Sequence, residues 1–258
     1  MGSLHISRFA RAIRYSARAC KTLLFDQRYF TSVLDGEYKD DEGYLPWFTY
    51  TAIEALKNWD LSQKRIFEYG SGYSTLFWAS RCKELVSVEH HSSWHEKISH
   101  LAPKNVQLIL APINETKNDY HPSPETLVEF KTYAESISNL GKFDVIVLDG
   151  YARSRMRYQC AIAALPHLTQ GGIIILDNSD WLPATATFLR QAGLIEVDLS
   201  GPVPGNAQTQ TTSFFLSRDF DFQPANLREP RMPVGGRPDN WERALEEEML
   251  ASRGIKPE

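Results

Sequence analysis

Cysteine is scarce in this chain of 258 residues, which has Cys20, Cys82 and Cys160 and no Cys-x-x-Cys pair. This spacing excludes a zinc knuckle and a disulfide scaffold, and it favours a reducing compartment, the cytoplasm. Long apolar runs are also missing, since no stretch approaches the roughly 18 residues that a membrane span needs. The net charge of −4 offers no bulk attraction for nucleic acid. The chain is therefore expected to be an ordinary globular protein whose partners are not nucleic acids.

Acidic residues are absent from the first 25 positions. Basic residues recur there at helical spacing: Arg8, Arg11, Arg14, Arg18 and Lys21. Phe9, Ile13 and Ala17 fall between them, as in an amphipathic helix. We expect a solvated helix packed on the domain. A membrane-surface helix, giving peripheral membrane contact through residues 1–25, and an organelle presequence are the alternatives.

Strand and helix patterns alternate five times from residue 64 onward. Strands are predicted at 65–70, 85–90, 106–111, 143–150 and 171–180, followed in succession by 194–201 and 211–220. Helices are predicted at 74–82, 92–102, 126–140, 157–168 and 183–193. Alternation implies right-handed crossovers and a parallel sheet, and the final pair can form a hairpin. The fold class is therefore α/β, a Rossmann-like doubly wound sheet that is mostly parallel with an antiparallel last strand.

Three regions are expected. Residues 1–63 form an N-terminal helical extension and lid, residues 64–220 form the cofactor-binding domain, and residues 221–258 form a C-terminal loop and short helix. Within the first region, four aromatic residues crowd around Pro46: Tyr44, Trp47, Phe48 and Tyr50. They form either an aromatic lid over the site or a hydrophobic plug beneath the N-terminal helices.

The segment Glu-Tyr-Gly-Ser-Gly ends the first predicted strand, where ligands bind in a doubly wound sheet. Gly70 and Gly72 allow a tight turn and a close approach of the backbone to a ligand. Glu89 ends the second strand and can accept both hydroxyls of a ribose. A dinucleotide site needs a third glycine, but Thr75 stands there, and the carboxylate of Glu68 would face a pyrophosphate badly. A cofactor with a cationic amino-acid end, S-adenosylmethionine, fits better than NAD.

Residues 64–217 resemble a class I S-adenosylmethionine-dependent methyltransferase, with Phe-Glu-Tyr-Gly-Ser-Gly as the first motif and Ser-Val-Glu-His as the second. The two-strand finish resembles the reversed seventh strand of that family. The resemblance implies S-adenosylmethionine as cofactor. It implies cofactor-binding roles for seven positions: Glu68, Gly70, Ser71, Gly72, Ser74, Glu89 and His90. Among them, Glu89 would hold the ribose, and His90 would lie beside the adenine.

Three oxygen-bearing side chains end the next two strands: Asp149 the fourth, and Asp177 and Asn178 the fifth. Neighbouring ends of a parallel sheet bring such groups together, and oxygen ligands suit Mg²⁺ or Ca²⁺. Their spacing resembles the metal triad of catechol and caffeoyl-CoA type O-methyltransferases. The lysine that those enzymes carry after the first Asp is missing here. The residues that follow Asp149 include Ala152, Arg153, Arg155 and Arg157.

Two versions of the catalytic site therefore stay open, a metal site and a metal-free polar pocket. Asp149 is the first choice for a direct role, accepting a proton or binding metal, with Asp177 second and Asn178 beside them. Arg157 clamps an anionic acceptor, orients a carboxylate, or only pairs on the helix surface. Tyr120 and His121, in an insertion after the third strand, are further candidates, with His121 as a base.

The function expected is methyl transfer from S-adenosylmethionine to an oxygen or nitrogen of a small molecule. An aminopropyltransferase-like enzyme on the same fold is one alternative, although the arginines after Asp149 argue against a polyamine. A non-catalytic nucleoside-binding scaffold domain is the other. The acceptor and the oligomeric state stay open.

Overall fold

A computed structural model describes residues 2–26, 29–36, 38–113, 124–150, 154–227, 231–234, 236, 248–249 and 251–253. Most of the expected C-terminal helix, Tyr120 and His121, and Ala152 and Arg153 lie outside the described residues.

The centre of the molecule is a seven-stranded sheet with the order β5-β4-β3-β6-β7-β9-β8. Its strands are β3 (Arg65–Tyr69), β4 (Glu84–Glu89), β5 (Val106–Leu110), β6 (Phe143–Leu148), β7 (Leu168–Leu176), β8 (Ile195–Val203) and β9 (Asn206–Leu216). The strands β3 to β7 pair in parallel, whereas β9 pairs antiparallel with both β7 and β8. The predicted fold class is confirmed, including the reversed strand near the edge.

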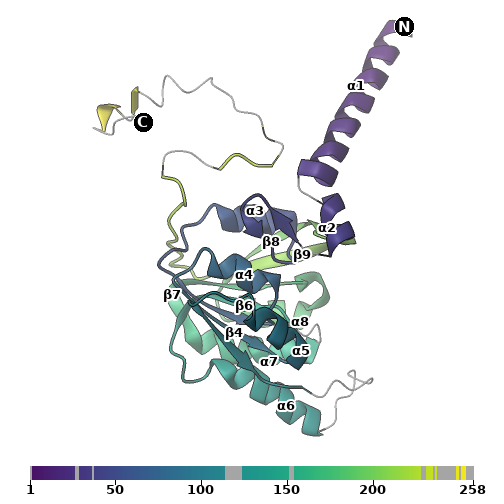
Figure 1. Cartoon of the computed structure of the whole chain (residues 1–258). Helices are drawn as coiled ribbons and strands as arrows, with labels where there is room; N and C mark the ends of the chain where they lie inside the picture. The colour runs from purple at the N-terminus through teal and green to yellow at the C-terminus, as the bar shows by residue number, and fades with distance from the viewer. Residues whose placement is uncertain are drawn as a thin grey trace.

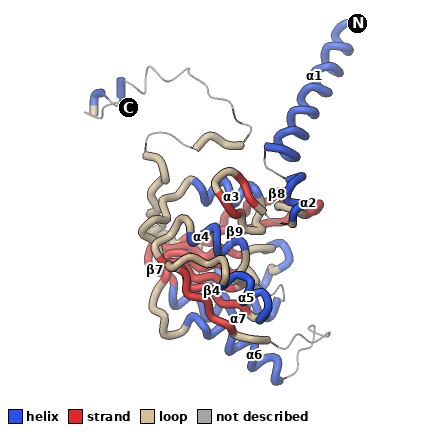
Figure 2. The backbone as a smooth tube through the Cα atoms, in the orientation of Figure 1, coloured by secondary structure: helices blue, strands red, loops and turns tan. Residues whose placement is uncertain are grey.

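Helices cover both faces of this sheet (Figures 1 and 2). The helices that follow the strands are α4 (Tyr73–Ala79), α5 (Ser92–Ser99), α6 (Pro124–Ala134), α7 (Ser154–Ala164) and α8 (Pro183–Gln191). Side chains of α6, α7 and α8 pack in the core on one face, and those of α3 (Tyr50–Lys57) and α4 pack on the other. Side chains alternate along a strand, so Phe67 and Tyr69 face the first core while Ile66 and Glu68 face α4.

Short elements precede α3: α1 (Gly2–Lys21), a π-helical turn (Thr22–Asp26), α2 (Tyr29–Asp35), and the hairpin of β1 (Lys39–Asp40) and β2 (Gly43–Tyr44). The α2 helix docks on the β8–β9 turn, where Ser32 Oγ accepts from Gly205 N at 2.9 Å. The expected N-terminal helix is present, but the expectation that it packs on the domain is wrong. The α1 helix projects away from the domain, and its side chains from Ala10 to Lys21 are exposed (Figure 1).

Candidate active site

Two glycine turns touch at the carboxyl end of the sheet. Gly70, after β3, has a φ of +94°, and Gly150, after β6, has a φ of +97°. A Cβ on Gly70 would lie 2.2 Å from Gly150 Cα, which no side chain tolerates. These glycines are therefore required by backbone packing between neighbouring strand ends. Gly72 differs, since its backbone is extended and it is the N-cap residue that precedes α4.

Thr75 stands where a dinucleotide motif has its third glycine, and it links the turn to the buried acid. Its hydroxyl accepts from Gly72 N at 2.9 Å and donates to Glu68 Oε2 at 2.5 Å. Ser87 Oγ donates to the same oxygen at 2.7 Å. Burial, opposed by the hydroxyls of Ser74, Thr75 and Ser87, raises the pKa of Glu68 to about 7. Glu68 is fully buried beneath α4.

Glu89 holds the turn from the neighbouring strand. Its Oε2 accepts from Ser71 N at 3.0 Å, and its Oε1 accepts from His90 N at 2.9 Å and His91 N at 2.7 Å. These backbone amides fix the carboxylate in one orientation at the wall of the cavity. Each carboxylate oxygen can accept more than one hydrogen bond, so Oε2 keeps capacity for a ligand hydroxyl.

A cavity of about 540 Å³ lies above these turns. It is lined by Gly36, Tyr38, Trp47, Gly70, Ser71, Gly72, Tyr73, Ser74, Glu89, His90, His91, Ser93, Trp94, Asp149 and Gly150. Six of the seven residues expected to bind the cofactor are among them. The exception is Glu68, which the structure places beneath the turn rather than on the wall, because its strand position directs it toward α4.

The charge of this wall discriminates between cofactors. Among the described residues that line the cavity there are two carboxylates, Glu89 and Asp149, and no lysine or arginine. A pyrophosphate needs cations or a row of free amides, whereas a sulfonium and an ammonium group favour carboxylates. The wall therefore fits S-adenosylmethionine, and it fits a dinucleotide poorly.

The segment before α3 supplies the opposite wall. Tyr38 and Trp47 line the cavity with their rings stacked, 6.1 Å between centroids. Tyr44 stacks on Tyr73 at 5.2 Å. Phe48 and Tyr50 are instead buried in the core. The aromatic cluster around Pro46 thus divides, with part of it covering the cavity and part of it anchoring the cover.

Asp149 lies on the wall, and Arg157 orients it. Arg157 Nη2 donates to Asp149 Oδ1 at 3.1 Å, and Gly150 N donates to the same oxygen at 2.8 Å. Arg157 also donates to the backbone oxygens of Leu148 and Asp177 at 2.7 and 3.0 Å. Arg157 is 1% exposed, so the expectation that it only pairs on the helix surface is wrong. It joins the ends of β6 and β7 and directs Asp149.

Asp177 and Asn178 do not face the cavity, because β9 engages the residues that follow β7. Asp177 Oδ1 accepts from Thr212 Oγ1 at 2.7 Å, and Asn178 Nδ2 donates to Gln210 Oε1 at 2.9 Å. Burial, reinforced by the charge of Asp149, raises the pKa of Asp177 well above its usual range. Among the described residues, no cluster of three His, Cys, Asp or Glu side chains could hold a metal ion. The metal version of the site gains no support from these contacts.

Residues 67–179 match a protein family described as "Methyltransferase domain". The chain carries a class I S-adenosylmethionine-dependent methyltransferase domain. The match covers both glycine turns, Glu89 and Asp149. No curated protein sequence matches the chain.

Solved methyltransferases share parts of this fold at low identity. The precorrin-6y C5,15-methyltransferase of Geobacter metallireducens is 13% identical, with a TM-score of 0.46 over 70% of this chain and 93% of its own. The O-methyltransferase TomG of Streptomyces achromogenes is 14% identical, with a TM-score of 0.43 over 65% and 78% of the chains. The N-methyltransferase NodS of Bradyrhizobium japonicum is 12% identical, with a TM-score of 0.43 over 60% and 86%.

Trp94 lines the cavity of the methyltransferase, and the sequence did not predict this. Trp94 Nε1 donates to Ser71 O at 2.5 Å, which fixes its ring beside the turn. Its edge meets the ring of Tyr73, with centroids 6.1 Å apart. Aromatic residues in the first turn of a helix usually pack inward, so the sequence carries no signal for this placement.

We expect Glu89→Gln to weaken binding of S-adenosylhomocysteine about tenfold or more, because a hydrogen bond to a charged group contributes roughly 1.5–3 kcal/mol. Calorimetry measures the change. Glu84→Gln is the matched control, since Glu84 begins the same strand and pairs with Arg65, at the opposite end from the cavity. Equal affinity in both variants would remove Glu89 from the ribose role.

Proposed function

We propose that the methyltransferase methylates a hydroxyl or amino group of a small molecule that binds beside Asp149 under the cover of Tyr38 and Trp47. The observation that carries this proposal is the position of Asp149, which lies on the same cavity wall as Glu89 and the glycine turns. An aromatic cover narrows access, which favours a small acceptor over a polymer. The net charge of −4 supports no polyanionic substrate.

When bound, S-adenosylmethionine supplies the methyl group and a neutral thioether leaving group. The chain's contribution is to position the acceptor and to receive its proton. Both hydrogen bonds to Asp149 go to Oδ1, so among the described residues Oδ2 is left to accept a proton. Burial, with the charge of Glu89 adding to it and Arg157 opposing it, raises the pKa of Asp149. A raised pKa makes this carboxylate a stronger base.

The test is incubation of the protein with methyl-labelled S-adenosylmethionine and a metabolite extract, with total RNA in a parallel reaction. Label in a small product, lost in Asp149→Asn, is the expected result. Label in RNA alone would overturn the small-molecule acceptor and leave the methyltransferase assignment intact.

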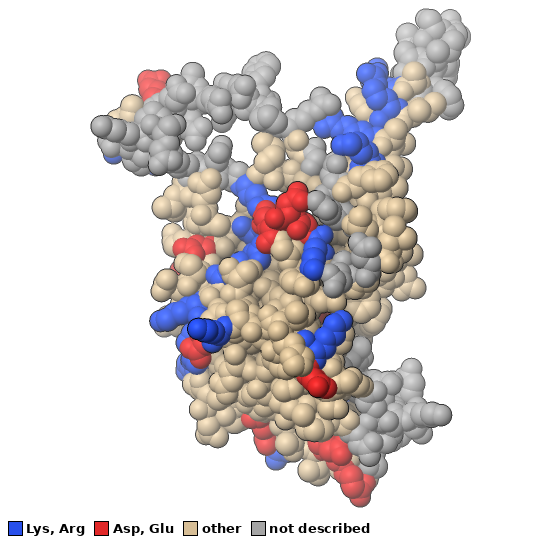
Figure 3. Space-filling view, viewed as in Figure 1, with Lys and Arg blue, Asp and Glu red and all other residues tan. Residues whose placement is uncertain are grey.

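We further propose that α1 lies on an anionic membrane surface. Basic residues line this helix and no acid falls within it, as the described part shows in Figure 3. The described side chains Arg11, Arg14, Arg18 and Lys21 recur on one face, while Ile13 is exposed on another. Within the described residues, no helix is long and apolar enough to cross a bilayer. A helix with a basic face and a few apolar side chains can bind to a membrane surface without crossing the bilayer.

Each basic residue near an anionic surface contributes about 1 kcal/mol, so the double variant Arg11→Gln/Arg14→Gln should bind vesicles about 30-fold more weakly. Sedimentation with phosphatidylcholine vesicles, with and without phosphatidylglycerol, measures this. The control is Lys83→Gln/Lys104→Gln, which removes the same charge from exposed sites on the domain. Binding that is equal with and without phosphatidylglycerol would contradict the proposal.

A further inference from the structure

We propose that Lys57 and Glu42, which lie outside the cavity, position the β1–β2 hairpin and thereby set how tightly the cavity holds its ligands. The proposal rests on the assignment of this cavity as the cofactor and acceptor site. It makes both side chains positioning residues, acting through the aromatic cover.

The hairpin is too short to be stable alone. Each strand has two residues, and Gly43, the first residue of β2, has a φ of +123°. Within the hairpin, Asp40 Oδ1 accepts from Glu42 N at 2.8 Å, and Leu45 N donates to Tyr38 O at 2.7 Å. An isolated two-stranded hairpin is at best marginally stable in water. Contacts from elsewhere in the chain must hold it.

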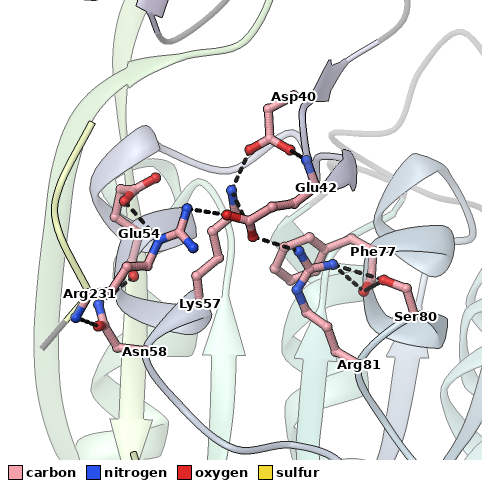
Figure 4. Close-up of polar contacts among 9 residues, drawn as sticks. All are labelled: Asp40, Glu42, Glu54, Lys57, Asn58, Phe77, Ser80, Arg81 and Arg231. Carbon is pink, nitrogen blue, oxygen red and sulfur yellow. Dashed lines mark hydrogen bonds and ion pairs between the residues drawn. The ribbon is translucent and has the colours of Figure 1, made fainter. Parts of the chain in front are cut away.

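Besides the stacking of Tyr44 on Tyr73, the hairpin has ionic contacts with three other segments (Figure 4). Glu42 accepts from Arg81, which follows α4, at 3.3 Å, and it pairs with Arg231 of the C-terminal segment. It also lies 3.5 Å from Lys57 Nζ on α3. Burial alone would raise the pKa of Glu42. The hydrogen bond from Arg231 and the charges of Lys57 and Arg231 outweigh burial, so the pKa of Glu42 lies below its ordinary value. Glu42 is thus ionised and central to the cluster.

Lys57 is the member of the cluster that depends most on the hairpin. Its side chain is 1% exposed, and among the described residues its ammonium group pairs with Asp40 and Glu42, both on the hairpin. A buried cation that loses its partners is strongly destabilised. If the hairpin moved away, Lys57 would be left buried and unpaired. The closed position of the hairpin is therefore the one that satisfies Lys57.

The hairpin in turn carries the wall of the cavity. Tyr38 directly precedes β1, and Tyr44 in β2 stacks on Tyr73. Tyr38 stacks on Trp47, and Tyr38, Trp47 and Tyr73 all line the cavity. A shift of the hairpin displaces these rings, although no member of the ionic cluster touches the cavity.

The test is Lys57→Met, which removes the cation but keeps a buried side chain of similar length. Hydrogen exchange of the peptide covering residues 38–46 should become about tenfold faster, because the hairpin loses its anchor. The dissociation constant for S-adenosylhomocysteine should rise about fivefold. The thermal midpoint should fall only modestly, because Asp40 and Glu42 are partly exposed and Glu42 keeps Arg81 and Arg231 as partners. Adding Asp40→Asn to Lys57→Met should then change little, since the pair is already broken.

Glu196→Gln is the matched control, because Glu196 pairs with Arg190 in an ion pair outside the cavity wall. It should leave hairpin exchange and cofactor affinity unchanged. Unchanged exchange in both Lys57→Met and Glu42→Gln would overturn the proposal, as would equal effects in the control. Both readouts need no methyl acceptor, so a wrong acceptor class would leave them intact. Conversely, a methyl-transfer assay can succeed while this proposal fails.

Discussion

Replacing Asp149 by Asn should lower the rate of methyl transfer by about 10²-fold or more, the usual effect of losing a general base. The substitution is conservative in this setting. The amide oxygen can still accept from Gly150 N and Arg157, and the amide nitrogen then stands where Oδ2 would receive the proton. Single-turnover kinetics with labelled cofactor measure the rate, and calorimetry checks that cofactor binding is retained.

The pH profile gives a second readout of the same residue. Because the pKa of Asp149 is raised, the wild-type rate should climb as the pH rises through that pKa and the carboxylate loses its proton. The rate of the Asn variant should not rise with pH in this range.

A chelator should leave the wild-type rate unchanged, since Asp177 and Asn178 are engaged by β9. Loss of activity with chelator and recovery with Mg²⁺ would instead restore the metal version of the site. Full activity in both Asp149→Asn and Asp177→Asn would move the acceptor chemistry to the segment around Trp47.

The sheet was predictable because its signals are local. Apolar runs such as those of β6 and β7 are buried on both faces, and helix patterns separate the first five strands. The final hairpin was also visible, since two strand patterns follow each other without a helix. The reversed last strand rested on the resemblance. The order of the sheet, with β9 between β7 and β8, was not predicted, because strand order depends on long-range pairing that periodicity does not encode.

The residues of the candidate site that depend on local spacing were predictable, and those that depend on long-range contacts were not. The cofactor turn and Glu89 depend on short spacings, and the structure places them at the cavity wall. Asp177 and Asn178 follow β7, as predicted, but their orientation is decided by Thr212 and Gln210, which are more than thirty residues away in sequence. Arg157 shows the converse. An arginine on a helix is usually exposed, so nothing in the sequence indicates that this one is buried against two strand ends.

Glu68 should make the protein less stable as the pH rises from about 4.5 to about 7. Burial raises its pKa from 4.5 to about 7 in the folded protein. The folded state therefore prefers the protonated form, and this preference stabilises the protein fully below the unfolded pKa. The stabilisation is lost as the pH rises through the folded pKa, and a shift of this size corresponds to about 3 kcal/mol. Glu68 is fully buried and is hydrogen-bonded by Thr75 and Ser87, so its ionised form has no water to solvate it.

Glu68→Gln removes the titration while keeping a polar side chain under α4. Urea unfolding at a series of pH values should show the wild type losing about 3 kcal/mol more than this variant between pH 4.5 and 7. Glu84→Gln provides the contrast, because the hydrogen bond from Arg65 lowers the pKa of Glu84. The stabilisation from Glu84 is present above its unfolded pKa and lost only toward acid, so that variant should follow the wild-type slope across the same range. Parallel curves for wild type and Glu68→Gln would mean that Glu68 is ionised in the folded protein at neutral pH, and a buried carboxylate directly beneath the cofactor turn would then be available to attract a cationic ligand.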